Sequence, residues 1–259
     1  MASNWKFYRP VANFFAATAT ATTGTSANLA NILEPHRTIH ADIDTVSGNS
    51  FVARYDFAAS ITADCVALVE HNTYTARNTP SAATLTVSHA ATSGGIYTGV
   101  ASAYTIVAAD EPIFLETFSS ASDQYWKLDF DDVLNTLYCG FAFLGKTVET
   151  SVDPNWEQPI KVGIEEGRIV TTMPDGFNQK VREYGVKKGW QIKYQLLNDS
   201  DEAILRAWLE DDDLVDLPFV FTKDGGTTYY YGELIGDPEW IPQQQGLHDL
   251  MFTISEVIA

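Results

Sequence analysis

The sequence predicts a mainly β protein, in which an N-terminal antiparallel jelly-roll or β-sandwich is followed by a β-sandwich domain with one α-helix. Three observations predict this class. Apolar and polar residues alternate in many short segments, which is the period of a strand with one buried face. Clusters of Gly, Pro, Asn and Ser separate these segments. Helical spacing of apolar residues occurs in one segment, residues 200–209.

The first 35 residues are predicted to form an N-terminal arm. Ser, Thr, Ala and Asn dominate residues 16–30, a composition typical of loops or a surface arm rather than of a packed element. Several large apolar side chains precede this stretch, and so many are not expected on a free tail: Trp5, Phe7, Tyr8, Phe14 and Phe15. We expect them to dock either on this subunit or on a neighbouring one.

Residues 36–145 are predicted to form the first sandwich. The apolar run at residues 65–69 has the continuous pattern of a strand buried on both faces. Seven or eight strands without a long helix between them favour an antiparallel sandwich. The clearest strand patterns lie at residues 51–57, 65–69, 83–89, 112–118, 125–130 and 136–144.

Residues 146–259 are predicted to form the second domain. Its boundary is placed near residues 145–159, because Asp153-Pro154 and Gln158-Pro159 are expected to interrupt strand pairing. Residues 223–226, Lys-Asp-Gly-Gly, predict a hairpin turn. The expected strands lie at residues 160–165, 168–173, 179–186, 190–197, 218–222, 228–235 and 247–257.

The passage from strand to helix at residues 190–209 organises this second domain. Trp190, Ile192, Tyr194 and Leu196 alternate with polar residues and are expected on one face of a strand. Asp199 and Glu202 have the spacing of a capping box, so they are expected to accept hydrogen bonds from the first free amides of the helix at 200–209.

The charge balance argues against a nucleic-acid-binding protein. The chain has 34 acidic and 16 basic residues and a net charge of −18, which repels phosphates. Lys187-Lys188 is the one basic doublet and is expected in a hairpin turn, and no basic patch is evident. We therefore expect no nucleic-acid sequence recognition.

The two cysteines and the hydropathy pattern indicate a protein folded in a cytoplasm. Cys65 and Cys139 lie in apolar strand-like runs and are expected to be buried free thiols, although a disulfide between them stays open. No run reaches the roughly 18 apolar residues of a membrane span. Residues 1–30 lack the basic segment and apolar core of a signal peptide.

Histidines and acidic clusters were considered as metal ligands. His36 and His40 have the spacing of a zinc pair but lack the glutamate of a metalloprotease helix, so a polar loop or strand edge is favoured. His71 ends a buried strand, where a turn-forming residue is also expected. Residues 210–213, Glu-Asp-Asp-Asp, follow the helix and are read as a solvated surface, with a basic partner as the alternative.

Calcium ligation was weighed for two further acidic groups. Asp42, Asp44 and Asn49 lack the spacing of a calcium loop. Residues 129–132, which include Asp129, Asp131 and Asp132, are the best of these candidates. Nucleophile elbows, phosphate-binding loops and dinucleotide fingerprints are absent from the sequence. We therefore expect no enzyme and assign no catalytic, cofactor-binding or metal residue.

Two stretches resemble known families. Residues 51–57 (FVARYDF), 65–72 (CVALVEHN) and 125–130 (YWKLDF) resemble strands of discoidin-like, galactose-binding sandwiches. That resemblance implies a jelly-roll fold with loops that bind sugars, proteins or nothing, and no sugar-binding residue is carried over.

The second half is similar to the domain of bacteriophage tail-tube, distal-tail and minor-tail proteins. The similarity rests on the strand 190–197, the helix 200–209, the strand 216–221 (DLPFVF), a hairpin, and a last strand ending at residues 254–257 (ISEV). It implies a virion protein of the tail, assembled in the host cytoplasm. It also implies a ring of identical subunits, with a hexamer as a candidate, and contacts with tube, hub or baseplate proteins.

These expectations combine into one predicted function and two alternatives. The prediction is a structural component of a phage tail near the tail tip, without a membrane span or a cofactor. The alternative from another class is a carbohydrate-binding module that attaches to host surface glycans. A hydrolase with an accessory sandwich would require paired carboxylates in a cleft, for which the sequence offers no candidates.

Overall fold

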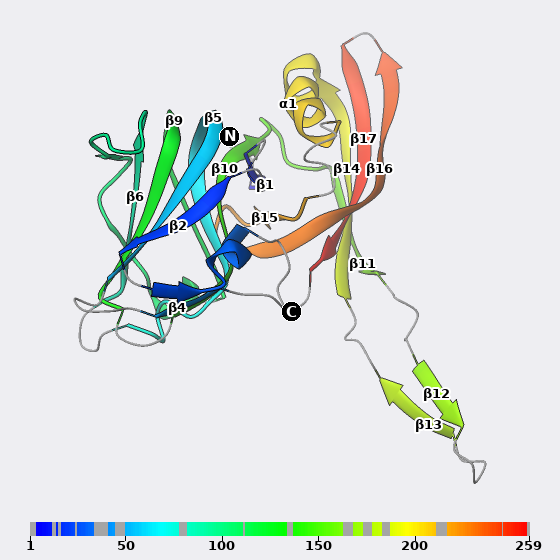
Figure 1. Ribbon diagram of the computed structural model, residues 1–259. Coiled ribbons are helices and arrows are strands. Elements are labelled where there is room, and N and C mark those ends of the chain that lie inside the picture. Colours follow the sequence, from blue (N-terminus) through cyan, green and yellow to red (C-terminus); the bar gives the residue numbers. More distant parts are fainter. Residues whose placement is uncertain are drawn as a thin grey trace.

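The computed structural model describes residues 4–257 except 12–13, 15–16, 24, 34–40, 45–49, 78–81, 111, 134–136, 163–167, 173–177, 183–186, 211–216 and 245. It confirms the predicted class, because antiparallel strands dominate and α1 (Asp199–Leu209) is the one α-helix among the described residues. Figure 1 shows two packed bodies side by side and a separate hairpin that lies away from both.

The first body is a sandwich built around two long paired strands, β5 (Phe51–His71) and β9 (Ile113–Asp131). Each was predicted as two shorter strands, and that prediction was wrong because register shifts let the chain bend without ending the ladder. The remaining strands are β2 (Thr18–Thr23), β3 (Thr25–Ala27), β4 (Ala41–Asp44), β6 (Thr84–Ala90), β7 (Thr98–Gly99), β8 (Tyr104–Thr105) and β10 (Leu137–Glu149). Two short 3₁₀ helices accompany them, η2 (Leu29–Leu33) and η3 (Ala108–Asp110).

The second body packs α1 on a sheet of β11 (Trp156–Val162), β14 (Lys187–Asn198), β17 (Leu247–Glu256), β16 (Tyr230–Gln244) and β15 (Phe219–Thr222). Leu205, Trp208 and Leu209 point from the helix into a core that also contains Ile192 and Phe252. Pro159 was expected to interrupt strand pairing, and this was wrong, because it lies inside β11. Among the described strands, β11 pairs with β14 alone. An edge strand tolerates proline because its outer amides need no partner.

The N-terminal strand joins the two bodies. β1 (Lys6–Pro10) pairs with β10 on one side and with β15 on the other, so one continuous sheet runs through both bodies. Phe7 is buried in the core of the second body, whereas Tyr8 and Phe14 are buried in the core of the first. Trp5, Phe7, Tyr8 and Phe14 thus dock on this same subunit, whereas Phe15 lies outside the described residues. The predicted division at residues 35 and 145 stays a prediction.

The described part of residues 17–30 departs from the expected loop. β2 pairs with β5, and β3 pairs with β4. The alternating Thr and Ala residues of β2 form a strand because the edge of β5 supplies hydrogen-bond partners for their backbone groups. Local composition does not predict this pairing.

The strand β14 departs from strict alternation near its end. Trp190, Ile192 and Tyr194 are buried as predicted, but Leu196 is 56% exposed and Leu197 is buried instead. A register shift between Tyr194 and Leu197 explains the change, because the additional residue of a bulge moves the following side chains to the other face. Leu196 adopts φ of 56°, as the kink requires.

The helix cap also differs from the prediction. The cap is Asn198, whose side chain accepts hydrogen bonds from the amides of Ser200 and Asp201. Asp199 and Glu202 do not form the predicted capping box. Asn198 holds extended backbone angles and ends β14, so a single residue closes the strand and starts the helix.

The hairpin of β12 (Arg168–Thr172) and β13 (Asn178–Arg182) forms its own two-stranded sheet. Among the described residues, neither strand pairs with the larger sheet. Figure 1 shows it beyond the far end of β11 and β14, clear of both bodies. We call residues 163–186 the arm.

Cys65 and Cys139 are buried free thiols, as expected. The search of the described residues for a helix long and apolar enough to cross a membrane found none.

Candidate functional site

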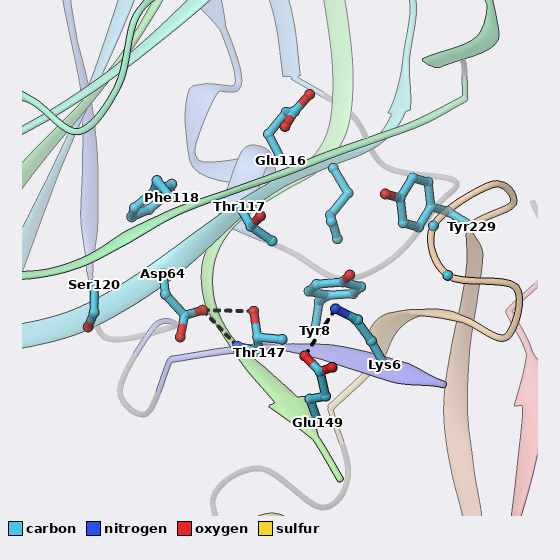
Figure 2. Close-up of a pocket in the computed structure, with 13 residues that line it drawn as sticks. Lys6, Tyr8, Asp64, Glu116, Thr117, Phe118, Ser120, Thr147, Glu149 and Tyr229 are labelled. Carbon is cyan, nitrogen blue, oxygen red and sulfur yellow. Dashed lines mark hydrogen bonds and ion pairs between the residues drawn. The ribbon is translucent and has the colours of Figure 1, made fainter. Parts of the chain in front are cut away.

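A pocket of about 490 Å³ opens where the two bodies meet. It lies among β1, β5, β9, β10 and the turn between β15 and β16 (Figure 2). Its lining is mostly polar or aromatic and comprises Lys6, Tyr8, Asp64, Leu115, Glu116, Thr117, Phe118, Ser120, Thr147, Glu149, Gly225, Gly226 and Tyr229. The pocket exists because β1 brings the N-terminus between two bodies that are distant in sequence.

Two hydrogen-bonded pairs fix the polar side of the pocket. Asp64 Oδ1 accepts hydrogen bonds from the Thr147 amide at 2.7 Å and from Thr147 Oγ1 at 3.0 Å. Lys6 Nζ lies 3.0 Å from Glu149 Oε2, across the pairing of β1 with β10. Figure 2 shows both pairs on the side of the pocket opposite Glu116. The carboxylates are therefore held in fixed directions before any ligand enters.

Two tyrosines form the aromatic part of the lining. The rings of Tyr8 and Tyr229 meet edge to face, with centroids 6.3 Å apart. Burial raises the pKa of Tyr8 well above its usual range, and the neighbouring Tyr229 raises it further. Burial, followed by the charge of Glu116, also raises the pKa of Tyr229. Both phenols are therefore protonated at neutral pH and can donate a hydrogen bond.

Glu116 is the acid on the β9 side. Partial burial raises the pKa of Glu116, and the nearby Asp110 raises it further. With Asp64 and Glu149, it places three carboxyl groups around a single lysine. This arrangement can accept hydrogen bonds from a hydroxyl-rich or cationic ligand, whereas an anionic ligand would be repelled.

The turn between β15 and β16 closes one wall. Asp224 Oδ1 accepts hydrogen bonds from the amides of Thr227 and Thr228, both at 2.9 Å. Burial acts to raise the pKa of Asp224, but the hydrogen bonds outweigh it and lower the pKa to about 2. Gly225 adopts φ of 73° and donates its amide to the Asn4 carbonyl at 3.1 Å, which ties the turn to the N-terminus. The hairpin turn predicted here is confirmed.

The sequence predictions did not identify this pocket. Its lining residues come from five distant segments, and no local motif joins them. The one available signal was the run of large apolar side chains at residues 5–15, which had to pack on something.

Among the described residues, none of the candidate metal ligands lines this pocket. His71 is buried, donates from Nε2 to the Asp110 carbonyl at 3.0 Å and accepts at Nδ1 from Thr73 Oγ1 at 2.9 Å, so it fastens a turn. Asp129, Asp131 and Asp132 do not join a group of ligand side chains among the described residues. Burial and the charge of Asp131 raise the pKa of Asp129.

His36, His40, Asn49 and residues 211–213 lie outside the described residues, as does the side chain of Asp44.

The arm, together with the strand ends at its base, is a second candidate surface because of its charge. Residues 160–190 contain six basic and four acidic residues, while the rest of the chain contains ten and thirty. Lys187 and Lys188 were expected in a turn, and this was wrong, because they begin β14 at the base of the arm. Three of these basic residues, Arg168, Lys180 and Arg182, lie on β12 and β13 of the arm. The other three, Lys161, Lys187 and Lys188, lie on β11 and β14 at its base. The basic doublet is thus part of a longer basic region that folding assembles.

Neither a family model nor a curated protein matches the sequence. Solved structures match part of the chain, and several of them are carbohydrate-binding modules. A chitosan-binding module from a Paenibacillus sp. IK-5 chitosanase/glucanase has a TM-score of 0.39 at 18% identity, over 52% of this chain and 98% of that module. A family 32 carbohydrate-binding module of Clostridium perfringens NanJ, solved with galactose, has a TM-score of 0.39 at 11% identity, over 52% and 96%.

A larger enzyme is similar over a smaller part of its length. A GH29 fucosidase of Ruminococcus gnavus, solved with fucose, has a TM-score of 0.41 at 11% identity. The match covers 52% of this chain and 26% of the fucosidase. All three similarities are partial and concern about half of the present chain.

Proposed function

We propose that the protein is a structural subunit of a multi-subunit assembly, and that its arm docks on a neighbouring copy. One observation carries the proposal: a two-stranded hairpin that pairs with neither packed body among the described residues. An isolated two-stranded hairpin is marginally stable in water, because it buries too little apolar surface. A partner surface would supply the burial that this subunit does not.

The charge pattern supports a second copy as that partner. Residues 160–190 contain six basic and four acidic residues, with three of the basic residues at the base of the arm, whereas the rest of the chain is strongly acidic. Opposite charges on two surfaces steer association and fix its register. An arm of one subunit placed on the acidic body of the next is a heterologous contact, which closes into a ring when the rotation permits.

The assembly that we propose follows the resemblance of the second half to tail proteins. We infer a bacteriophage tail, with the subunit in a ring near the tail tip and in contact with tube, hub or baseplate proteins. The role is architectural, without a catalytic step, and the location is the virion after assembly in the host cytoplasm. Acidic surfaces in such a ring would not hold DNA in transit.

The test is the light-scattering mass of the full chain beside that of an arm-trimmed variant. Val162 and Lys187 are directly paired, so an Asn-Gly turn in place of residues 163–186 closes the hairpin with little disturbance. We expect the full chain to form species larger than 28.6 kDa and the trimmed variant to remain a folded monomer. Equal oligomeric states for both, or a monomeric full chain at low salt, would overturn the proposal.

A second candidate function rests on the pocket. Its fixed carboxylates, two protonated tyrosines and Phe118 are the chemistry that binds a saccharide, since hydroxyl groups need acceptors and sugar faces pack on aromatic rings. We therefore propose glycan binding at the pocket as an additional role. The probes are galactose and chitosan fragments.

Calorimetric titration of these sugars tests the second candidate. We expect Asp64→Asn and Tyr229→Ala to weaken binding, because each removes a group that lines the pocket. Tyr138→Ala is the matched control, since Tyr138 is an exposed tyrosine outside the pocket. Unaltered affinity in both pocket variants, or no binding by the full chain, would reject the glycan role and leave the assembly proposal untouched.

A further inference from the structure

We propose that Asp199, Glu202 and His248 bind one divalent transition-metal ion of the zinc type where α1 meets β17. The sequence pattern predicts no metal ligand, and His248 is not among its candidate ligands. The three side chains offer one nitrogen and two oxygen ligand atoms that lie within 4.8 Å of one another. An imidazole with two carboxylates is a ligand set that suits zinc and its neighbours in the first transition row.

The distances between the ligand atoms fit one small cation. His248 Nε2 lies 2.9 Å from Glu202 Oε2 and 3.9 Å from Asp199 Oδ1. Two ligands of one tetrahedral zinc ion are about 3.3 Å apart, given bonds of about 2.0 Å. Small side-chain rotations therefore place all three atoms at bonding distance. Water would complete the coordination on the outer side, where Asp199 is 79% exposed.

The backbone fixes the relative positions of the three ligands. Asp199 and Glu202 are three residues apart on α1, so they share one face of its first turn. In the pairing of β17 with β14, His248 lies opposite Leu197. Leu197 precedes Asp199 by two residues. Asn198 caps the helix directly between these elements. The site thus depends on strand pairing and on the helix cap.

Neighbouring hydrogen bonds select and orient the carboxylates. Arg206 donates to Glu202 Oε1 at 2.8 Å, which leaves Oε2 directed toward His248. Asp201 is the third acid of the first turn. Its Oδ2 accepts hydrogen bonds from Ser151 Oγ at 2.6 Å and from Asn198 Nδ2 at 2.8 Å. Such outer contacts hold metal ligands in place. They also explain why Asp199 and Glu202, and not Asp201, face the histidine.

Electrostatics also constrain the proposal. The N-terminus of α1 carries a partial positive charge that repels a cation. Two carboxylates oppose this effect, and their negative charge exceeds the half charge of the dipole. Bound metal would replace the present contact of His248 with Glu202 and clamp α1 to the end of the β16–β17 hairpin.

The experiment titrates the tag-free full chain, first treated with a chelator, with ZnCl₂ by calorimetry. Co²⁺ serves as a second probe because its visible absorption reports nitrogen and oxygen ligation. We expect one equivalent of Zn²⁺ to bind and to raise the unfolding temperature. His248→Gln and Asp199→Asn should each weaken binding by about tenfold or more, since each removes a ligand.

Two control variants separate this site from other histidines. His89→Gln alters a histidine paired with Asp123 in the first body and should retain full affinity. A double variant, His36→Gln with His40→Gln, tests the pair with zinc-like spacing and should also retain it. Absence of stoichiometric Zn²⁺ binding, or unaltered affinity in His248→Gln, would overturn the proposal.

Discussion

The ring of Phe7 lies 4.8 Å from the indole of Trp208, measured between centroids, and this contact ties the first strand of the chain to its helix. Phe7 is 1% exposed and also contacts Phe219 and Phe252. Its neighbour Tyr8 points into the core of the first body. Alternation along β1 therefore places successive side chains in two different cores.

Removal of the Phe7 ring should destabilise the second body strongly. We expect Phe7→Ala to lower the free energy of unfolding by about 3–5 kcal/mol, because the ring leaves a cavity among aromatic neighbours. Urea denaturation followed by tryptophan fluorescence measures the change. Val107→Ala, at an exposed position, should stay within about 0.5 kcal/mol of the parent. A similar small effect for Phe7→Ala would contradict the role of β1 as a shared strand.

The helix cap predicts a contrast between two adjacent positions. Asn198→Ala should cost about 1 kcal/mol, because two helix amides lose their acceptor. Asp199→Ala should cost much less in metal-free buffer, since its side chain is largely exposed. Thermal unfolding of both variants decides between the observed cap and the capping box that the sequence predicted. The reverse order of the two effects would favour the capping box.

The Asp224 turn predicts a dependence on acidity. Its pKa is about 2 in the folded chain, below the usual 3.8, so the unfolded chain takes up the proton first as the pH falls. The stabilisation by Asp224 should be complete above pH 4 and disappear as the pH approaches 2. Unfolding temperatures of the parent and Asp224→Asn should accordingly differ at pH 5–7 and converge toward pH 2. A constant difference across this range would refute the assignment.

The two thiols should be inert in the native protein. Burial raises the pKa of Cys139 to about 12 and that of Cys65 well above its usual value, so neither forms a thiolate at pH 8. We expect no reaction with a thiol reagent at pH 8 until denaturant is added, when both react. Rapid labelling of the native protein would contradict this prediction. Loss of that labelling in Cys65→Ser or in Cys139→Ser would identify the accessible thiol.

Charge reversal in the arm should weaken self-association. Lys180→Glu places a negative charge on β13, where an acidic neighbour would repel it, whereas Lys146→Glu makes the same charge change at an exposed position on β10. The first variant should dissociate at a lower salt concentration than the parent, and the second should resemble the parent. Sedimentation at several ionic strengths provides the comparison, and equal behaviour of both variants would argue against arm docking.

Local pattern was sufficient for most strands and for the helix. Neighbouring residues alone predict three features that the structure contains. These are burial at residues 65–69, the hairpin turn at residues 223–226 and the helix near residues 200–209. Two errors arose where a distant strand decides the outcome. The Thr-rich β2 forms only because β5 pairs with it, and Leu196 turns outward because a bulge faces β17.

The candidate pocket needed information that no local window contains. Lys6, Asp64, Glu116 and Tyr229 meet only after β1 has paired with β10 and β15. The basic residues at the base of the arm could not be joined for a similar reason. Pairing of β11 with β14 brings Lys161 opposite Lys188, although they are distant along the chain.

Hydrogen–deuterium exchange of the arm is the most direct test of the central claim that this hairpin binds a neighbouring copy. The amides of β12 and β13 should exchange rapidly in dilute protein at high salt and become protected at concentrations and salt levels where the protein associates. Exchange in β5 should stay slow in both states, because that strand is in the core. Arm amides that exchange equally fast in the associated and dissociated states would contradict the claim.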